Sequence, residues 1–231
     1  MPVIHQFGFH ESLTGIWQIT ETSGQLLTRL APDKEAMKQY RNFTHEQRKK
    51  QWLAYRLILK HLLSPSQAGI RYDIHGKPFL ISGSHHISVS HAGTMAAAVC
   101  NRKFEVGIDI ETIKDRLARV KERFLNRDEL DHLDTKPDLE LLYIHWCGKE
   151  ALYKLLGTPD TDFKKDIHIH AFDYLCHSNG TFIATLDTPA GPMSCTLFYR
   201  KVQDYMLVVA NREGAGGKMQ GAEREMLNKG L

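Results

Sequence analysis

Short apolar runs and one long stretch with helical spacing make up the first half of the chain. Between about residues 32 and 63, Trp52, Tyr55 and Leu59 recur at intervals of three and four residues, which predicts a helix. The segments around it are short, apolar and bounded by turn residues, which is typical of strands. The expected strands lie at 15–20 (GIWQIT), 25–30 (QLLTRL), 69–81 (two strands around a His-Gly-Lys-Pro turn), 86–100 and 103–113.

The second half repeats this order of elements without repeating the sequence. Two helical patterns are followed by four strand patterns, at 116–134, 138–157, 166–172, 181–187, 194–202 and 205–211. We therefore expect an α+β fold built from two similar α+β lobes in a pseudo-twofold arrangement. The expected division is an N-terminal lobe over 1–111, a C-terminal lobe over 112–212 and a mobile tail over 213–231.

Composition limits the class of protein. The 231 residues are 42% hydrophobic and 25% charged, which is ordinary for a globular protein. Because no apolar stretch has the length of a membrane span and the start lacks a signal-peptide pattern, a cytoplasmic protein without a membrane partner is expected. The cysteines, at 100, 147, 176 and 195, form no close pair, which argues against a zinc ribbon and a disulfide framework. A net charge of +3 does not indicate a nucleic-acid partner.

Positive charge is concentrated in the predicted helix. Residues 41–60 hold six lysines and arginines against the single acidic residue Glu46, and Arg48, Lys49 and Lys50 are consecutive. Two interpretations stay open. The stretch is either a solvated helix face, which is the usual outcome, or a site for a phosphorylated ligand.

A pair of carboxylates stands in the apolar stretch GIDIETI, residues 107–113. Side chains alternate along a strand, so Asp109 and Glu111 point to the same face, about 7 Å apart. Two like charges on a buried face repel and lose hydration, so the pair is useful where a cation joins it to a ligand. Without a third carboxylate, the simpler alternative is favoured, in which one residue is salt-bridged and the other exposed.

The stretch HWCGKEALYKLLG, residues 145–157, supplies a third carboxylate. Glu150 and Lys154 are four residues apart on a predicted helix and therefore share a face. Such a pair is commonly only a surface ion pair worth a few tenths of a kcal/mol. The apolar neighbours of this pair place its face near the boundary of the core, so three carboxylates and a lysine could hold a metal–diphosphate unit.

Four motifs occur in a fixed order along the chain: GKP (76–78), SVSHAG (88–93), GIDIE (107–111) and WCGKEALYK (146–154). With these motifs the sequence resembles the 4′-phosphopantetheinyl transferase superfamily, in particular its larger surfactin-synthetase type with two fused halves. The combination of GIDIE and W-x-x-K-E-A at this separation is specific, whereas GKP or SH alone would be weak. The resemblance implies the two-lobed fold of that superfamily and transfer of phosphopantetheine from coenzyme A to a serine of an acyl or peptidyl carrier protein, with release of adenosine 3′,5′-bisphosphate.

The resemblance also implies roles for individual residues. Asp109, Glu111 and Glu150 match the carboxylates that hold Mg²⁺ on the pyrophosphate of coenzyme A. Glu150 is then the candidate to take the serine proton, and Lys154 matches the lysine that contacts the phosphates.

The resemblance also implies contacts with coenzyme A. The expected contacts are Lys77, Pro78, Ser90 and His91, with Asp109 and Lys154 beside the phosphates. The candidate catalytic residues are Glu150, Lys154 and His91. Its 3′-phosphate is expected at a basic residue of the helix, for which the candidates are Arg48, Lys49 and Lys50. Three positions depart from the pattern of the family and concern only the surroundings of the site, namely Gln51, Ser88 and Ala92.

Carrier proteins are strongly acidic, and the stretch after the carboxylate strand offers a basic partner surface. Residues 114–123 carry five basic side chains beside Leu117 and Val120, with Phe124 following them. We expect the apolar side chains to face partly inward and the basic ones to face the carrier protein of a monomeric enzyme. Two other functions stay open, an Mg²⁺-dependent phosphohydrolase and an inactive module that binds coenzyme A or a carrier protein.

Overall fold

The computed structural model describes residues 3–135, 137–174 and 179–212, and the predicted tail lies outside these residues. The first half contains β1 (Val3–Phe9), β2 (Ser12–Gln18), α1 (Ser23–Leu30), α2 (Lys34–Arg41), α3 (Glu46–Leu62), η1 (Pro65–Gln67), β3 (Ile70–Tyr72), β4 (Pro78–Leu80), β5 (His86–Ala92) and β6 (Met95–Asn101). The second half contains β7 (Val106–Thr112), η2 (Asp115–Arg123), α4 (Arg127–Thr135), α5 (Leu139–Leu156), β8 (Ile167–Ile169), β9 (Asn179–Thr188), β10 (Gly191–Val202) and β11 (Tyr205–Arg212).

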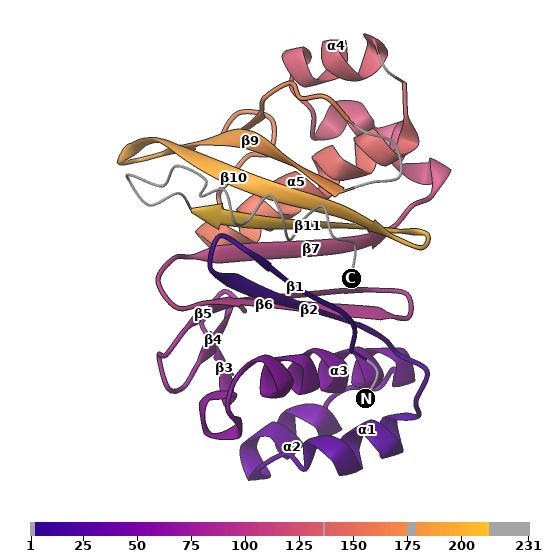
Figure 1. Cartoon of the computed structure of the whole chain (residues 1–231), viewed down its shortest axis with the longest axis vertical. Coiled ribbons are helices and arrows are strands. Elements are labelled where there is room, and N and C mark those ends of the chain that lie inside the picture. The colour runs from indigo at the N-terminus through magenta and orange to yellow at the C-terminus, as the bar shows by residue number, and fades with distance from the viewer. Residues whose placement is uncertain (1–2, 136, 175–178, 213–231) are drawn as a thin grey trace.

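The elements form two antiparallel sheets, each covered by one long helix (Figure 1). The first sheet has the order β1-β2-β6-β5 and packs against α3, while the second has the order β7-β11-β10-β9-β8 and packs against α5. The hairpin of β3 and β4 forms a separate two-stranded sheet. The predicted α+β class is confirmed. Because β7 pairs with β11, the strand that carries Asp109 is hydrogen-bonded into the second sheet; the division into lobes at residues 111 and 112 stays a prediction.

One predicted strand is wrong. Residues 25–30 lie in helix α1, not in a strand. The side chain of Thr22 accepts a hydrogen bond from the Gln25 backbone and the side chain of Gln25 accepts one from the Thr22 backbone, which is a capping box that starts a helix. Leu26 is the residue that α1 buries against α3.

The predicted helix over 116–134 is interrupted. Residues 115–123 form the 3₁₀ helix η2, and α4 begins only at Arg127. Asn126 and Glu129 explain the break, because the side chain of each accepts a hydrogen bond from the backbone N–H of the other. This reciprocal cap starts a new helix after Phe124 and Leu125 have entered the core.

The two sheets meet where β5 runs beside β7, and each of these strands is the edge of its sheet. An open edge strand exposes backbone groups that need partners. Here the N–H of Ile108 donates to Ser88 Oγ at 3.2 Å and the N–H of Ile110 donates to Ser90 Oγ at 3.3 Å. The two-residue spacing on both strands makes the match possible, so the serine hydroxyls join the two sheets.

Alternation along β7 separates structural from polar side chains. Ile108 and Ile110 are fully buried in the core between the two sheets. Gly107 faces α5, because a Cβ atom there would lie 1.8 Å from the carbonyl oxygen of Ala151. Asp109 and Glu111 alternate in the same register, which directs their carboxylates toward the α5 side of the strand.

Replacing Gly107 with alanine is expected to destabilise the protein strongly, because the added methyl group meets helix backbone that cannot rotate away. Overpacking of this kind typically costs about 1–3 kcal/mol, and we expect the upper end or more. The measurement is the free energy of unfolding in urea. The matched control is Gly8→Ala in β1, where the nearest atom would lie at 3.7 Å; equal stability of the two variants would contradict the close packing of α5 on β7.

Candidate active site

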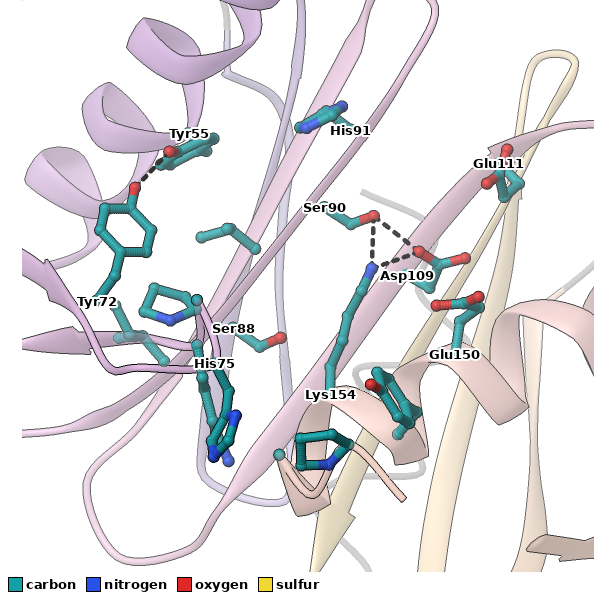
Figure 2. A pocket seen from close by; sticks show the side chains of 18 of the residues that line it. Tyr55, Tyr72, His75, Ser88, Ser90, His91, Asp109, Glu111, Glu150 and Lys154 are labelled. Carbon is teal, nitrogen blue, oxygen red and sulfur yellow. Dashed lines mark hydrogen bonds and ion pairs between the residues drawn. The ribbon is translucent and has the colours of Figure 1, made fainter. Parts of the chain in front are cut away.

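A pocket of about 600 Å³ lies between the two halves of the chain, and its wall is formed by α3, the β3–β4 hairpin, β5, β7 and α5. Figure 2 shows that the polar side chains of β5, β7 and α5 converge on one part of this pocket. The wall includes Asp109 and Glu111 from the GIDIE motif and Glu150 and Lys154 from the WCGKEALYK motif. The structure therefore brings these four residues together.

Asp109 is the most buried of the charged groups in the pocket, with 3% of its surface exposed. Its Oδ1 atom accepts hydrogen bonds from Lys154 Nζ at 2.6 Å and from Ser90 Oγ at 2.8 Å. Lys154 Nζ also donates to Ser90 Oγ and to the backbone carbonyl of Ile108, at 3.1 and 3.2 Å. One carboxylate is thus tied to β5 and α5 together, as Figure 2 shows.

The second oxygen of Asp109, Oδ2, is buried and has no hydrogen-bond partner. Buried carboxylate oxygens normally have one, because an unsatisfied polar atom in the interior is costly. Figure 2 shows Glu150 and Glu111 beside this carboxylate, one from α5 and one farther along β7. Within the described residues, no three His, Cys, Asp or Glu side chains form a ready-made metal site, but the unsatisfied oxygen and two flanking carboxylates are a donor set that fits a hard cation such as Mg²⁺.

The pKa values of Glu150 and Glu111 are both raised above the ordinary value for a glutamate. Burial and the charges of Asp109 and Glu111 raise the pKa of Glu150 to about 7, against a smaller opposing effect of Lys154. Burial and Asp109 likewise raise the pKa of Glu111. For Lys154, burial lowers the pKa but the charge and hydrogen bond of Asp109 outweigh it, so that its pKa lies above the ordinary value. Glu150 can therefore accept or release a proton near neutral pH.

His91 and Arg48 form the other polar part of the pocket. The guanidinium of Arg48 contacts Nε2 of His91, and both residues line the wall. Burial, Arg48 and Lys154 lower the pKa of His91 to about 4. The imidazole is therefore neutral at physiological pH, and its Nε2 accepts from the guanidinium.

The remaining predicted contacts of coenzyme A are distributed unevenly. Lys77, Pro78 and Ser90 line the pocket, whereas Lys49 and Lys50 do not. The ammonium group of Lys49 instead lies 5.6 Å from the centre of the Tyr40 ring. Of the three consecutive basic residues, the structure thus places only Arg48 on the wall of the pocket.

Two tyrosines of the pocket were missed by the sequence analysis. The hydroxyl groups of Tyr55, on α3, and Tyr72, on β3, lie 2.6 Å apart and both side chains reach the wall. Tyr55 was recognised only as an apolar position of the helical pattern. A tyrosine on the inner face of a helix, followed by another in a strand, carries no motif that distinguishes a pocket wall from ordinary core.

Comparison with known proteins adds an independent observation to this geometry. Residues 105–210 match the family profile of the 4′-phosphopantetheinyl transferase superfamily. The matched segment is similar to that superfamily. It includes the whole of β7 and α5, and therefore Asp109, Glu111, Glu150 and Lys154. The predicted resemblance is confirmed.

Individual relatives carry the same name. The chain is 34% identical over 116 residues to 4′-phosphopantetheinyl transferase AcpT of Escherichia coli (strain K12), which covers 48% of this chain and 59% of that protein. It is 30% identical over 148 residues to 4′-phosphopantetheinyl transferase psf-1 of Bacillus pumilus, covering 62% of this chain and 60% of that protein. The chain thus spans about 60% of the length of these two transferases.

No described helix has both the length and the apolar character needed to cross a membrane. Cys100, Cys147 and Cys195 are buried. The roles assigned to individual side chains stay predictions.

Glu150→Gln is expected to stabilise the metal-free protein, and the gain should grow as the pH rises. A carboxyl group whose pKa is raised on folding favours the folded state below its unfolded pKa and loses this contribution as the pH rises through the folded pKa. The ordinary pKa of this glutamate is 4.5 and its pKa in the folded protein is about 7. The wild-type protein should therefore lose the contribution of Glu150 to its stability between roughly pH 4.5 and 7. The measurement is the free energy of unfolding in urea at pH 4.5 and at pH 8, in EDTA; the same difference between variant and wild type at both pH values would contradict the raised pKa.

Proposed function

We propose that the protein transfers 4′-phosphopantetheine from coenzyme A to a serine hydroxyl of an apo acyl or peptidyl carrier protein, releasing adenosine 3′,5′-bisphosphate. The single observation that carries the proposal is the convergence of Asp109, Glu111, Glu150 and Lys154 in one pocket. Three carboxylates and a lysine suit a metal-bound pyrophosphate. The match of residues 105–210 to the profile of the transferase superfamily supports the same reaction.

The carboxylates are proposed to hold Mg²⁺. The unsatisfied Oδ2 of Asp109, together with Glu111 and Glu150, supplies the oxygen ligands. When bound, Mg²⁺ would neutralise the charge of the pyrophosphate. The burial that raises the pKa values of Glu111 and Glu150 makes a metal-free state with three ionised carboxylates unfavourable, so the site favours a divalent cation.

Residues of this chain supply the proton transfers. The serine oxygen attacks the β-phosphorus, the bond between this phosphorus and the bridging oxygen breaks, and adenosine 3′,5′-bisphosphate leaves with the electron pair. Glu150 takes the serine proton, directly or through one water, because its carboxylate lines the same part of the pocket as Asp109 and Lys154. Lys154, held by Asp109 and Ser90, places its positive charge beside the phosphates.

Coenzyme A is proposed to extend from the carboxylates toward α3. Arg48 is the basic residue of the predicted cluster that reaches the pocket, and His91 beside it is neutral. The fixed positive charge of Arg48 therefore suits the 3′-phosphate. Pro78 and the backbone of the β3–β4 hairpin form the wall along which the nucleotide would lie.

The carrier protein is proposed to dock on η2. Leu117 and Phe124 are buried and Val120 packs against the same core, so the apolar side chains of this stretch face inward. Arg119 and Arg123 are exposed, which leaves a basic surface for the acidic helix of a carrier protein. A monomeric state and a cytoplasmic location stay predictions.

The direct test is to incubate the protein with Mg²⁺, coenzyme A and an apo carrier protein and to measure the mass of the carrier. We expect a gain of one phosphopantetheine, and Asp109→Asn should reduce the rate at least a hundredfold because it removes both the ligand charge and the partner of Lys154.

Two outcomes would reject the proposal. Release of phosphate or of pantetheine phosphate without a change in carrier mass would indicate a phosphohydrolase. Binding of coenzyme A without any product would indicate an inactive binding module. A panel of fatty-acid, polyketide and peptide-synthetase carriers, used in the same assay, identifies the preferred acceptor.

The 3′-phosphate assignment predicts different effects for two neighbouring basic residues. Arg48→Gln should raise the KM for coenzyme A by roughly tenfold or more and leave the KM for dephospho-coenzyme A nearly unchanged, because only the former carries the 3′-phosphate. Lys49→Gln is the matched control, since Lys49 does not line the pocket. The measurement is the KM of each variant for both substrates. If Arg48→Gln has the wild-type ratio of the two KM values, the 3′-phosphate does not bind at Arg48.

A further inference from the structure

The side chain of Lys77 does not point freely into the pocket. Its Nζ atom donates a hydrogen bond of 2.7 Å to the backbone carbonyl of Leu155, which belongs to the last turn of α5. The last four carbonyls of a helix lack partners within the helix, and a lysine that reaches one of them forms a charge-assisted bond at the negative end of the helix dipole. Lys77 therefore connects the β3–β4 hairpin of the first half to α5 of the second half.

The base from which Lys77 extends is fixed by a local network. Asp73 Oδ1 accepts hydrogen bonds from the backbone N–H groups of His75, at 2.9 Å, and of Lys77, at 2.8 Å. The backbone N–H of Asp73 in turn donates to the carbonyl of Lys77 at 3.0 Å. This closed turn holds the backbone of Lys77 in one conformation and so fixes the point from which its side chain extends.

The end of α5 is shaped to receive this side chain. Gly157 ends the helix with φ of +69°, and its N–H donates to the carbonyl of Tyr153 at 2.9 Å. A Cβ atom at position 157 would lie 2.7 Å from Cδ of Lys77 and 3.1 Å from its Nζ. Glycine is thus needed at this position both for the left-handed backbone and for the approach of the lysine.

The contact lies next to the proposed reactive groups. Leu155 directly follows Lys154, and Glu150 lies between one and two turns earlier on the same helix. Lys154 must reach Asp109 and Ser90 from α5, while Glu150 must face the same carboxylate. A shift in the last turn of α5 would move the ammonium group of Lys154 with respect to both partners.

We propose that Lys77 is a positioning residue, which fixes the C-terminal turn of α5 and thereby the place of Lys154 and Glu150 in the pocket. This inference rests on the proposed transferase function for its kinetic consequence. Its structural part, the restraint on α5, does not depend on the reaction.

The structural part is tested by amide hydrogen exchange on the protein without ligands. Lys77→Met keeps the length of the side chain and removes its donor, so the amide protons of residues 153–157 should exchange about tenfold faster, with unchanged exchange in the centre of α5. Lys60→Met is the matched control, because Lys60 Nζ donates in the same way to the carbonyl of Leu30 at the end of α1, which holds no residue of the pocket wall. Unchanged exchange at 153–157 in Lys77→Met would overturn the restraint.

The kinetic part separates positioning from phosphate binding. Misplacement of reacting groups lowers turnover, so Lys77→Met should reduce kcat by roughly ten- to a hundredfold with little change in the KM for coenzyme A. Lys77→Arg should recover part of this loss, since its guanidinium can donate to the same carbonyl, and Lys60→Met should keep the wild-type kcat. A raised KM with unchanged kcat would overturn the positioning role in favour of a phosphate contact.

The two parts can fail independently. If the wild-type protein transfers nothing to any carrier protein, the proposed function is rejected, and the exchange experiment still decides whether Lys77 restrains α5. If transfer occurs and the exchange of 153–157 is unchanged in Lys77→Met, the proposed function stands and the positioning role is rejected.

Discussion

The buried carboxylate of Asp109 needs charged and hydrogen-bonding partners, and these partners determine the arrangement of the whole site. An isolated carboxylate in the interior is strongly unfavourable, so it must be paired and hydrogen-bonded. Asp109 lies on β7 and obtains its partners from two other elements, Ser90 on β5 and Lys154 on α5. The same carboxylate therefore fixes the helix, the edge strand of the other sheet and the orientation of the remaining oxygen.

This constraint is supported by the seam between the sheets. Ser88 and Ser90 satisfy the open edge of β7, which keeps the two sheets in one register and brings residues from motifs far apart in the sequence into one pocket. Removing one partner of a fully buried ion pair costs about 3–5 kcal/mol, a large part of the 5–15 kcal/mol that stabilises a typical domain. The side chain of Lys154 is 29% exposed, so its pairing contributes less than that figure. The site is held by the seam and the ion pair acting together.

Local patterns predicted much of this arrangement. Alternation along β7 placed Asp109 and Glu111 on one face, and helical spacing placed Glu150 beside Lys154. The helix α1 also has a local signal, the capping box of Thr22 and Gln25, which the expected strand over 25–30 left out of account. Other features depend on contacts outside the local pattern, because the side chains of Lys77 and Lys49 find their partners at Leu155 and Tyr40. The motif Gly-Lys-Pro alone does not indicate whether its lysine binds a phosphate or the end of a helix, because that depends on which groups surround the lysine in the folded protein.

The central claim is that the unsatisfied oxygen of Asp109 and the two neighbouring glutamates form one divalent-cation site beside bound coenzyme A. It is tested most directly by a crystal structure of the protein grown with coenzyme A and Mn²⁺, using anomalous scattering to locate the metal. The account predicts a single strong peak in contact with Asp109, Glu111 and Glu150, with the pyrophosphate of coenzyme A bound to the same ion. Coenzyme A in the pocket with the metal bound away from all three carboxylates would contradict it.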